Sequence, residues 1–273
     1  MELDQIMECS YEALRDWVYD NYEAAYCLGT GALTLGAWLM DSKRNERKAA
    51  YISGYMGILA LGVLLEPCVN VTSSLYGDVL SHGSRSSKKV ALTFDDGPHR
   101  HNTPEVLKVL EEEGVKASFF CVGQNAFDYP WLIKDIQKAG HLVGSHSFTH
   151  RNFLACTPRK AEEEILEGSL VLEAILNDKI RYYRPPYGNR YPWNIKYGES
   201  LRMRAVLWSN SPRDWQRPGA GIIAERVINS AKPGDIVLLH DGGGDRSQTV
   251  KALPTIIGNL RSRGFEFVRV DEL

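Results

Sequence analysis

The sequence of 273 residues lacks the cysteine patterns of a zinc knuckle or of a disulfide framework. No two cysteines have Cys-x-x-Cys spacing, and an odd number of cysteines cannot all pair within the chain. The five are scattered along the sequence: Cys9, Cys27, Cys68, Cys121 and Cys156. Cys121 lies in the apolar run 117–122 and is interpreted as a buried strand thiol.

The chain also lacks an excess of charge of either sign and any internal repeat. It has 32 Lys and Arg against 34 Asp and Glu, a net charge of -2. A nucleic-acid-binding protein usually carries a strongly basic surface. The composition therefore provides no basis for a nucleic-acid partner.

The N-terminus does not have the features of a cleaved secretion signal. Residues 1–23 contain Arg15 as their one basic residue among seven acidic ones, and no Ala-x-Ala site follows the next apolar run. We interpret 1–23 as an acidic amphipathic segment whose apolar positions have helical spacing.

Two uncharged segments follow, residues 24–40 and 49–65, each of about 17 residues, the lower limit for spanning a bilayer. The loop between them, 41–48, has four basic residues against two acidic ones. The positive-inside rule places this loop in the cytoplasm and the rest of the chain outside. Residues 24–65 are therefore predicted to form a transmembrane hairpin in the cell membrane, with a small helical domain or a packing hairpin as the alternative. Residues 66–87 are interpreted as a linker.

The strongest chemical signal is a pair of adjacent carboxylates, Asp95 and Asp96, at the end of the apolar run 90–94. Successive side chains on a strand point to opposite faces, so the two can share a site only if the chain bends there. One carboxylate could then hold a metal ion while the other accepts a proton. An Asp-Asp-Gly turn alone would be ordinary.

A second signal is the pair His146 and His150, which follows the short apolar strand 142–145. Histidines four residues apart share one face of a helical turn and can bind the same ion. Together with Asp96 they form a ligand set that leaves positions for water and substrate. We therefore predict a metal site at these three residues.

Three further motifs each follow a predicted strand. The first is Arg184-Pro185-Pro186-Tyr187-Gly188, in which the prolines and the glycine impose an irregular backbone. The second ends in Asp214-Trp215, and the third is an apolar strand, 236–239, that includes Leu238 and is followed by His240. Each motif found alone would be interpreted as a turn or a strand end.

In this order and spacing the five motifs resemble those of the polysaccharide deacetylases, the family of chitin, peptidoglycan and Nod-factor deacetylases. The resemblance covers residues 88–273. It implies an α/β fold, an incomplete (β/α) barrel of the NodB type, and hydrolysis of N-acetyl groups on a sugar polymer. It implies that Asp95 is the general base, oriented by Arg184, and that His240 is the general acid, tuned by Asp214. It further implies the metal ligands Asp96, His146 and His150, a Tyr187 backbone N–H in the oxyanion hole, and an acetyl pocket lined by Trp215 and Leu238.

Hydrolysis also follows from the residues themselves. A divalent ion can polarise a carbonyl and acidify a water molecule, an aspartate can take its proton, and a histidine can protonate the departing amine. Two imidazoles and a carboxylate suit zinc best, with cobalt, manganese and iron as alternatives.

The secondary-structure pattern agrees with a parallel barrel. Strands are predicted at 90–94, 117–122, 141–145 and near 182, 206, 236–239 and 265–270, alternating with helices at 103–113, 131–139, 158–176, 221–230 and 249–263. Every motif lies at or just beyond the C-terminal end of a strand, where barrel enzymes place their chemistry.

These motifs do not indicate which sugar polymer is the substrate. We expect N-acetylglucosamine residues of a cell-wall or extracellular polysaccharide, most simply peptidoglycan. A lipid-linked sugar, an O-acetylated glycan and a non-catalytic glycan-binding barrel remain as alternatives.

Overall fold

The computed structural model describes residues 54, 57 and 77–273. The predicted segment 1–23 and, apart from Gly54 and Gly57, the predicted hairpin 24–65 lie outside the described residues. Within the described part of the chain, no helix is long and apolar enough to cross a membrane. By its internal contacts the chain divides into two units, and the second, 74–273, carries all five motifs.

The second unit is built on one sheet of eight parallel strands, in the order β1-β6-β5-β4-β3-β2-β7, with β8 pairing the beginning of β2. The strands are β1 Val79–Leu80, β2 Lys89–Asp95, β3 Ser118–Cys121, β4 Leu142–Ser145, β5 Tyr182–Tyr183, β6 Arg204–Val206, β7 Asp235–His240 and β8 Glu266–Phe267. Single bridges connect Asn210 with Val237 and His82 with Asp235 across the remaining opening. The sheet thus curls into an incomplete barrel, as the sequence predicts.

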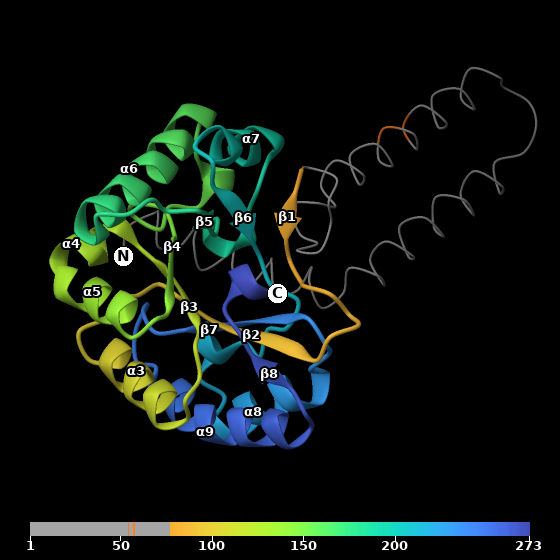
Figure 1. Ribbon diagram of the computed structural model, residues 1–273. Coiled ribbons are helices and arrows are strands. Elements are labelled where there is room, and N and C mark those ends of the chain that lie inside the picture. The colour runs from red at the N-terminus through yellow and green to blue at the C-terminus, as the bar shows by residue number, and fades with distance from the viewer. Residues whose placement is uncertain (1–53, 55–56, 58–76) are drawn as a thin grey trace, which may run out of the picture. The chain divides into compact units, whose positions relative to one another are not determined.

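Helices surround the strands on the outside of the barrel (Figure 1). They are α3 Asn102–Glu112, α4 Gly123–Asp128, α5 Pro130–Lys138, α6 Pro158–Leu176, α7 Pro192–Ser200, α8 Ala220–Ser230 and α9 Ser247–Ser262. The predicted helix 158–176 has the predicted ends, and the Thr157 side chain caps it by accepting a hydrogen bond from Lys160 N. The short helices α4 and α7 were not predicted.

The predicted linker 66–87 differs from the structure at its C-terminal end. Strand β1 lies within it and pairs with β6, and Leu80 is buried inside the barrel. The unit therefore begins before residue 88, because the barrel needs β1 beside β6 to cover that part of its interior.

Side chains alternate between two cores along each strand, as the two-residue period requires. On β2, Val90, Leu92 and Phe94 pack outward against the helices, whereas Ala91 points into the barrel. The barrel interior holds a separate small apolar cluster: Leu80, Ala91, Phe120, Val206, Ile236 and Val270.

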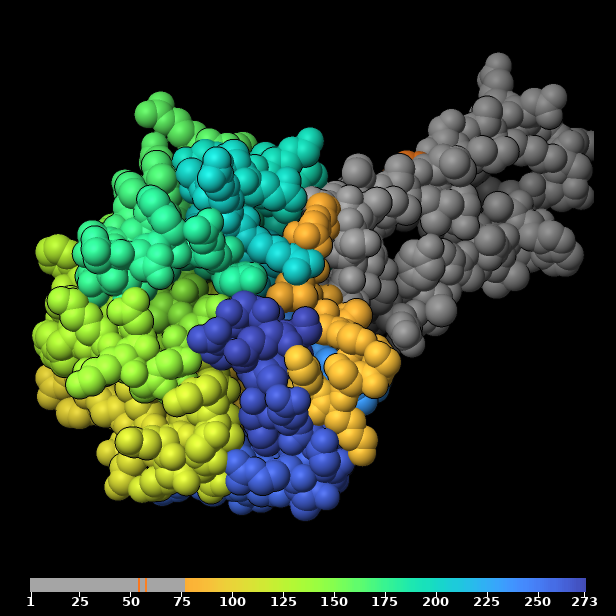
Figure 2. All heavy atoms as spheres, in the orientation of Figure 1, coloured from red at the N-terminus to blue at the C-terminus, as the bar shows by residue number. Residues whose placement is uncertain are grey.

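The C-terminal segment closes one end of the barrel. Val270 N donates a hydrogen bond to Ser118 Oγ at the beginning of β3, and Lys89 Nζ at the beginning of β2 donates to Glu272 O. Figure 2 shows these C-terminal residues, in dark blue, at the centre of one face of the unit. This face contains the N-terminal ends of the strands, so the site must use the opposite end.

Candidate metal and acid–base site

Asp95 points into the barrel because it shares the inward face of β2 with Ala91 and Thr93. Asp96 would point outward if the strand continued. Instead it has φ 68°, in the left-handed region, which turns the chain. This is the bend on which the sequence prediction depended, and both carboxylates reach the same site.

The local structure that brings His146 and His150 to the site differs from the one predicted. Residues 146–150 form a loop and not a helical turn, so the predicted helical face is wrong. Ser147 and His150 have φ of 64° and 60°, and these two left-handed residues fold the loop back on itself. The imidazoles still meet, with ring centroids 4.9 Å apart.

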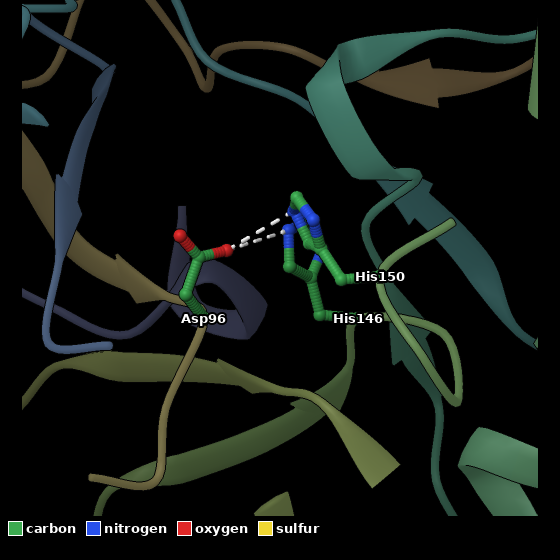
Figure 3. Close-up of side chains that lie close together, drawn as sticks. All are labelled: Asp96, His146 and His150. Carbon is green, nitrogen blue, oxygen red and sulfur yellow. Dashed lines mark ion pairs between the residues drawn. The ribbon is translucent and has the colours of Figure 1, made fainter. Parts of the chain in front are cut away.

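Asp96, His146 and His150 form a cluster of possible metal ligands whose ligand atoms lie within 4.8 Å of one another. Asp96 Oδ1 is 3.4 Å from His146 Nε2 and 3.2 Å from His150 Nε2 (Figure 3). Ligands about 2.1 Å from a tetrahedral zinc ion are separated from one another by about 3.4 Å. Among the described residues, Asp96 Oδ1 is buried without a hydrogen-bond partner, which suits an atom that binds a cation. The cluster therefore fits a divalent ion.

The electrostatics of the cluster hold Asp96 in its ionised, ligand form, while for His150 burial lowers the pKa and the Asp96 carboxylate raises it, with a net rise. Burial would raise the pKa of Asp96, but the charge of His150 and the close approach of both imidazoles hold it well below its usual value. His146 Nδ1 donates a hydrogen bond to Arg184 O at 2.7 Å, and this leaves Nε2 to face the cluster.

Asp95 lies between the cluster and a buried arginine. Its Oδ2 is 3.7 Å from His146 Nε2, while its Oδ1 accepts a hydrogen bond from Arg184 Nη1 at 2.6 Å. Arg184 is fully buried and also donates to Thr93 Oγ1 and to the carbonyl oxygens of Val206 and Leu207. The guanidinium thus orients Asp95 and leaves one carboxylate oxygen facing the cluster.

A second acid–base pair comes from β7 and the loop after β6. His240 Nδ1 donates to Asp214 Oδ1 at 2.7 Å, and Asp214 Oδ2 accepts from His240 N and from Thr249 Oγ1. Burial lowers the pKa of His240, but the Asp214 carboxylate, assisted by Asp96 and Asp95, raises it to about 9. At neutral pH the imidazole is therefore charged and can donate a proton.

The remaining predicted residues line the same end of the barrel. The Trp215 ring meets the His240 ring edge-on at 5.3 Å, and Leu238 shares the inward face of β7 with His240. Tyr187, with φ 60° in the turn Pro186–Gly188, places its ring 4.8 Å from that of His150. The irregular backbone predicted from Arg184-Pro-Pro-Tyr-Gly is thus present.

Several residues that support the site are not among those predicted from the sequence. Thr93 could have been found, because it lies two residues before Asp95 on the same strand face. Glu164 and Thr249 could not have been found from the sequence, because each lies on a helix distant in sequence from the group that it contacts. Asp241, directly after His240, is fully buried, and its pKa is raised to about 7, chiefly by burial.

A parallel barrel that carries a possible Asp–His–His metal site and acid–base groups at the C-terminal ends of its strands is compatible with a hydrolase. Comparison with known proteins narrows the class. Residues 82–206 match the family model described as "Polysaccharide deacetylase". The chain belongs to the polysaccharide deacetylase family, and its fold and enzyme class are those predicted from the five motifs.

Individual relatives and a solved structure support the same family assignment. The chain is 40% identical over 190 residues to a peptidoglycan-N-acetylglucosamine deacetylase of Bacillus cereus, covering 69% of this chain and 89% of that protein. It is 41% identical over 187 residues to a chitooligosaccharide deacetylase of Sinorhizobium fredii, covering 64% and 87%. The crystal structure of the Bc1960 peptidoglycan N-acetylglucosamine deacetylase superposes with a TM-score of 0.69 at 31% identity, covering 71% and 91%.

Proposed function

We propose that this chain is a metal-dependent deacetylase that removes N-acetyl groups from N-acetylglucosamine residues of peptidoglycan and releases acetate. The observation that carries the mechanism is the position of Asp95, held by Arg184 on one side and facing the Asp96, His146 and His150 cluster on the other. A general base beside a metal site and opposite a charged histidine suits amide hydrolysis.

Each group that the fold brings together at the site has a proposed role in the reaction. A divalent ion bound by Asp96, His146 and His150, most simply zinc, would polarise the acetamide carbonyl and acidify a water molecule. Asp95 accepts the proton of the attacking water, and the Tyr187 backbone N–H donates to the developing oxyanion. His240 then donates its proton to the amine nitrogen as the C–N bond breaks, and Asp214 holds its ring in place. Trp215 and Leu238 would surround the acetyl methyl group.

Exposed aromatic side chains support a sugar polymer as substrate. The rings of Tyr191 and Trp193 stack at 4.2 Å with an interplanar angle of 16°, and Trp193 is 41% exposed. Trp193 lies six residues after Tyr187, so it can be at most about 20 Å from the site. Flat, exposed aromatic surface at that distance suits contact with a neighbouring sugar ring of the same chain.

A chitin-type oligosaccharide is the second candidate, because the Sinorhizobium fredii relative is as similar as the Bacillus cereus one. Purified protein should be incubated with peptidoglycan, chitin oligomers and poly-N-acetylglucosamine, with and without a chelator, and the acetate and deacetylated sugars measured by mass. Chelator-sensitive release from peptidoglycan at the highest rate is expected. Preference for chitin oligomers would contradict the peptidoglycan assignment, and release that resists complete metal removal would contradict the metal mechanism.

We also propose that the chain is held at the cell membrane by residues 24–65, with the deacetylase unit outside the cytoplasm. The support is the charge pattern of the sequence, two uncharged segments around a basic loop. A cell-wall substrate lies outside the cytoplasm, so the deacetylase unit would have to be on that side of the membrane to reach it.

A further inference from the structure

His146 and His150 are held in different ways. The His146 ring is fixed by the hydrogen bond from its Nδ1 to Arg184 O, and its backbone N–H donates to Cys121 O at the end of β3. Across residues 77–273, no backbone carbonyl accepts a hydrogen bond from the His150 ring in this way. Apart from the contacts of its ring with Asp96 Oδ1 and the Tyr187 ring, the direction of His150 depends on the turn Ser147–His150 that carries it.

That turn needs outside support. Ser147 and His150 both have φ in the left-handed region, which residues other than glycine avoid. Such a conformation persists only where the surrounding structure imposes it. One support is internal, since His150 N donates to Ser147 Oγ at 3.0 Å. Outside the turn, Gly123 N and Gln124 N at the start of α4 donate to Ser147 O and Phe148 O, both at 2.9 Å.

Glu164 of α6 holds the opposite side of the same two peptide groups through their N–H donors. Its Oε2 accepts hydrogen bonds from Phe148 N at 3.2 Å and Thr149 N at 2.7 Å, and its Oε1 accepts from Thr149 Oγ1 at 2.8 Å. The residue is completely buried. Its nearest cationic atom among the described residues, Lys160 Nζ, is 3.9 Å away. The carboxylate is thus used chiefly to bind the two backbone N–H groups between Ser147 and His150.

The backbone of α6 also touches the turn, one helical turn after Glu164. A Cβ atom at Gly168 would lie 2.5 Å from the carbonyl carbon of Ser147 and 2.6 Å from its oxygen. Glu164 and Gly168 share one face of the helix. This face is therefore shaped to seat the turn.

We propose that Glu164 is a positioning residue, which holds the Ser147–His150 turn so that His150 Nε2 points at the ion bound by Asp96 and His146. The inference rests on the proposed metal site. Groups that orient metal ligands typically contribute about 10–100-fold to metal affinity.

The test is the zinc dissociation constant, measured by competition with a chromogenic chelator at a temperature where circular dichroism shows each variant folded. Glu164→Ala is expected to weaken zinc binding about 10–100-fold. Glu164→Gln should bind zinc nearly as well as the unmutated protein. Its amide oxygen can accept from both backbone N–H groups, and its amide N–H can donate to Thr149 Oγ1.

Two further variants separate positioning from general destabilisation. Leu172→Ala removes a fully buried core side chain from the same helix, two helical turns after Glu164, and should lower the unfolding temperature without lowering zinc affinity. Gly168→Ala raises the helix propensity of α6 but displaces the turn, so it should weaken zinc binding even if Glu164→Ala does not fold.

A double-mutant cycle tests whether Glu164 acts through His150. In a His150→Ala background, Glu164→Ala should cost little further affinity, because the ligand that it positions is gone. The inference would be overturned if Glu164→Ala and Gly168→Ala bound zinc normally, if Leu172→Ala lost as much affinity, or if the losses of the double variant multiplied. Absence of zinc binding by the unmutated protein would overturn the proposed metal site itself, and this inference with it.

Discussion

At the residue scale, the two adjacent aspartates have different surroundings. Asp95 forms a buried ion pair with Arg184, whereas Asp96 faces two imidazoles. A buried charge that loses its partner is costly. Substitutions at the two positions are therefore expected to fail in different ways.

Asp95→Asn should bind zinc but lose about 10²–10⁴-fold in kcat, because an amide can still accept from Arg184 but cannot take a proton from water. Asp96→Asn should lose zinc affinity as well as activity. Zinc content and acetate release measured on both variants check this. If Asp95→Asn lost the ion and Asp96→Asn kept it, the two roles would be reversed.

The pH dependence follows from His240. Its pKa is raised to about 9, so the proton that it donates is present at neutral pH and is lost as the pH rises through about 9. The same shift stabilises the fold below the unfolded pKa of about 6.5, and this contribution is also lost through about pH 9. The basic limb of the kcat profile is therefore expected near pH 9.

Asp214→Asn should move that limb to lower pH, because burial of His240 then lowers its pKa with less opposition from carboxylates. Rates measured from pH 5 to 11 on an acetamide and on an activated acetyl ester check the role. The ester should be affected less, since its leaving group needs no proton. Equal effects on both substrates would indicate that His240 positions substrate.

At the scale of elements, hydrophobic periodicity predicts the longer helices and the strands that alternate with them. It does not predict the short helices α4 and α7 next to the site. α4 and α7 have six and nine residues, and both follow strands that end at the site. The six residues of α4 are too few for a helical period to stand out, and α7 buries Asn194, Ile195 and Gly198 instead of the apolar stripe that α5, also of nine residues, has. The position of α4 depends on the loop of the histidines, because Gly123 N and Gln124 N donate hydrogen bonds to Ser147 O and Phe148 O.

The N-terminal end of α7 carries the stacked rings of Tyr191, its N-cap residue, and Trp193. Trp193→Ala should reduce kcat/KM on a polymer about tenfold, the loss of roughly 1.4 kcal/mol expected for one aromatic contact. Activity on a short acetylated sugar should be unchanged. Ile222→Ala on α8, which also removes an exposed apolar side chain, serves as the control. Equal losses on long and short substrates would contradict a distant sugar contact.

At the scale of the whole molecule, all ten predicted site residues lie in the second unit, which has its own core and a barrel closed at one end by the C-terminal segment. A protein beginning at Ser74 should therefore fold and release acetate, while one beginning at residue 88 lacks β1 and should be less stable. Thermal unfolding of the two shortened proteins compares them. Equal unfolding temperatures would show that β1 is dispensable.

The full chain should sediment with membranes, because residues 24–40 and 49–65 are long enough to span a thin bilayer. Protease added outside intact cells should cut the deacetylase unit and spare the basic loop 41–48. If the full chain stayed in solution without detergent, the proposed location would be wrong.

Alternating strands and helices in the sequence were enough to predict a parallel sheet, and the five motifs in their order were enough to predict the family, its barrel and the acid, base and ligand groups. The sequence also indicated that Asp95 and Asp96 could share a site only if the chain bends between them. How the groups meet depends on contacts between segments that are distant in sequence. The loop of His146 and His150 was expected to be helical and is instead held in left-handed turns by Glu164 of α6. The burial of Arg184 and the shifted pKa of His240 likewise arise from contacts between segments distant in sequence, which no local pattern records.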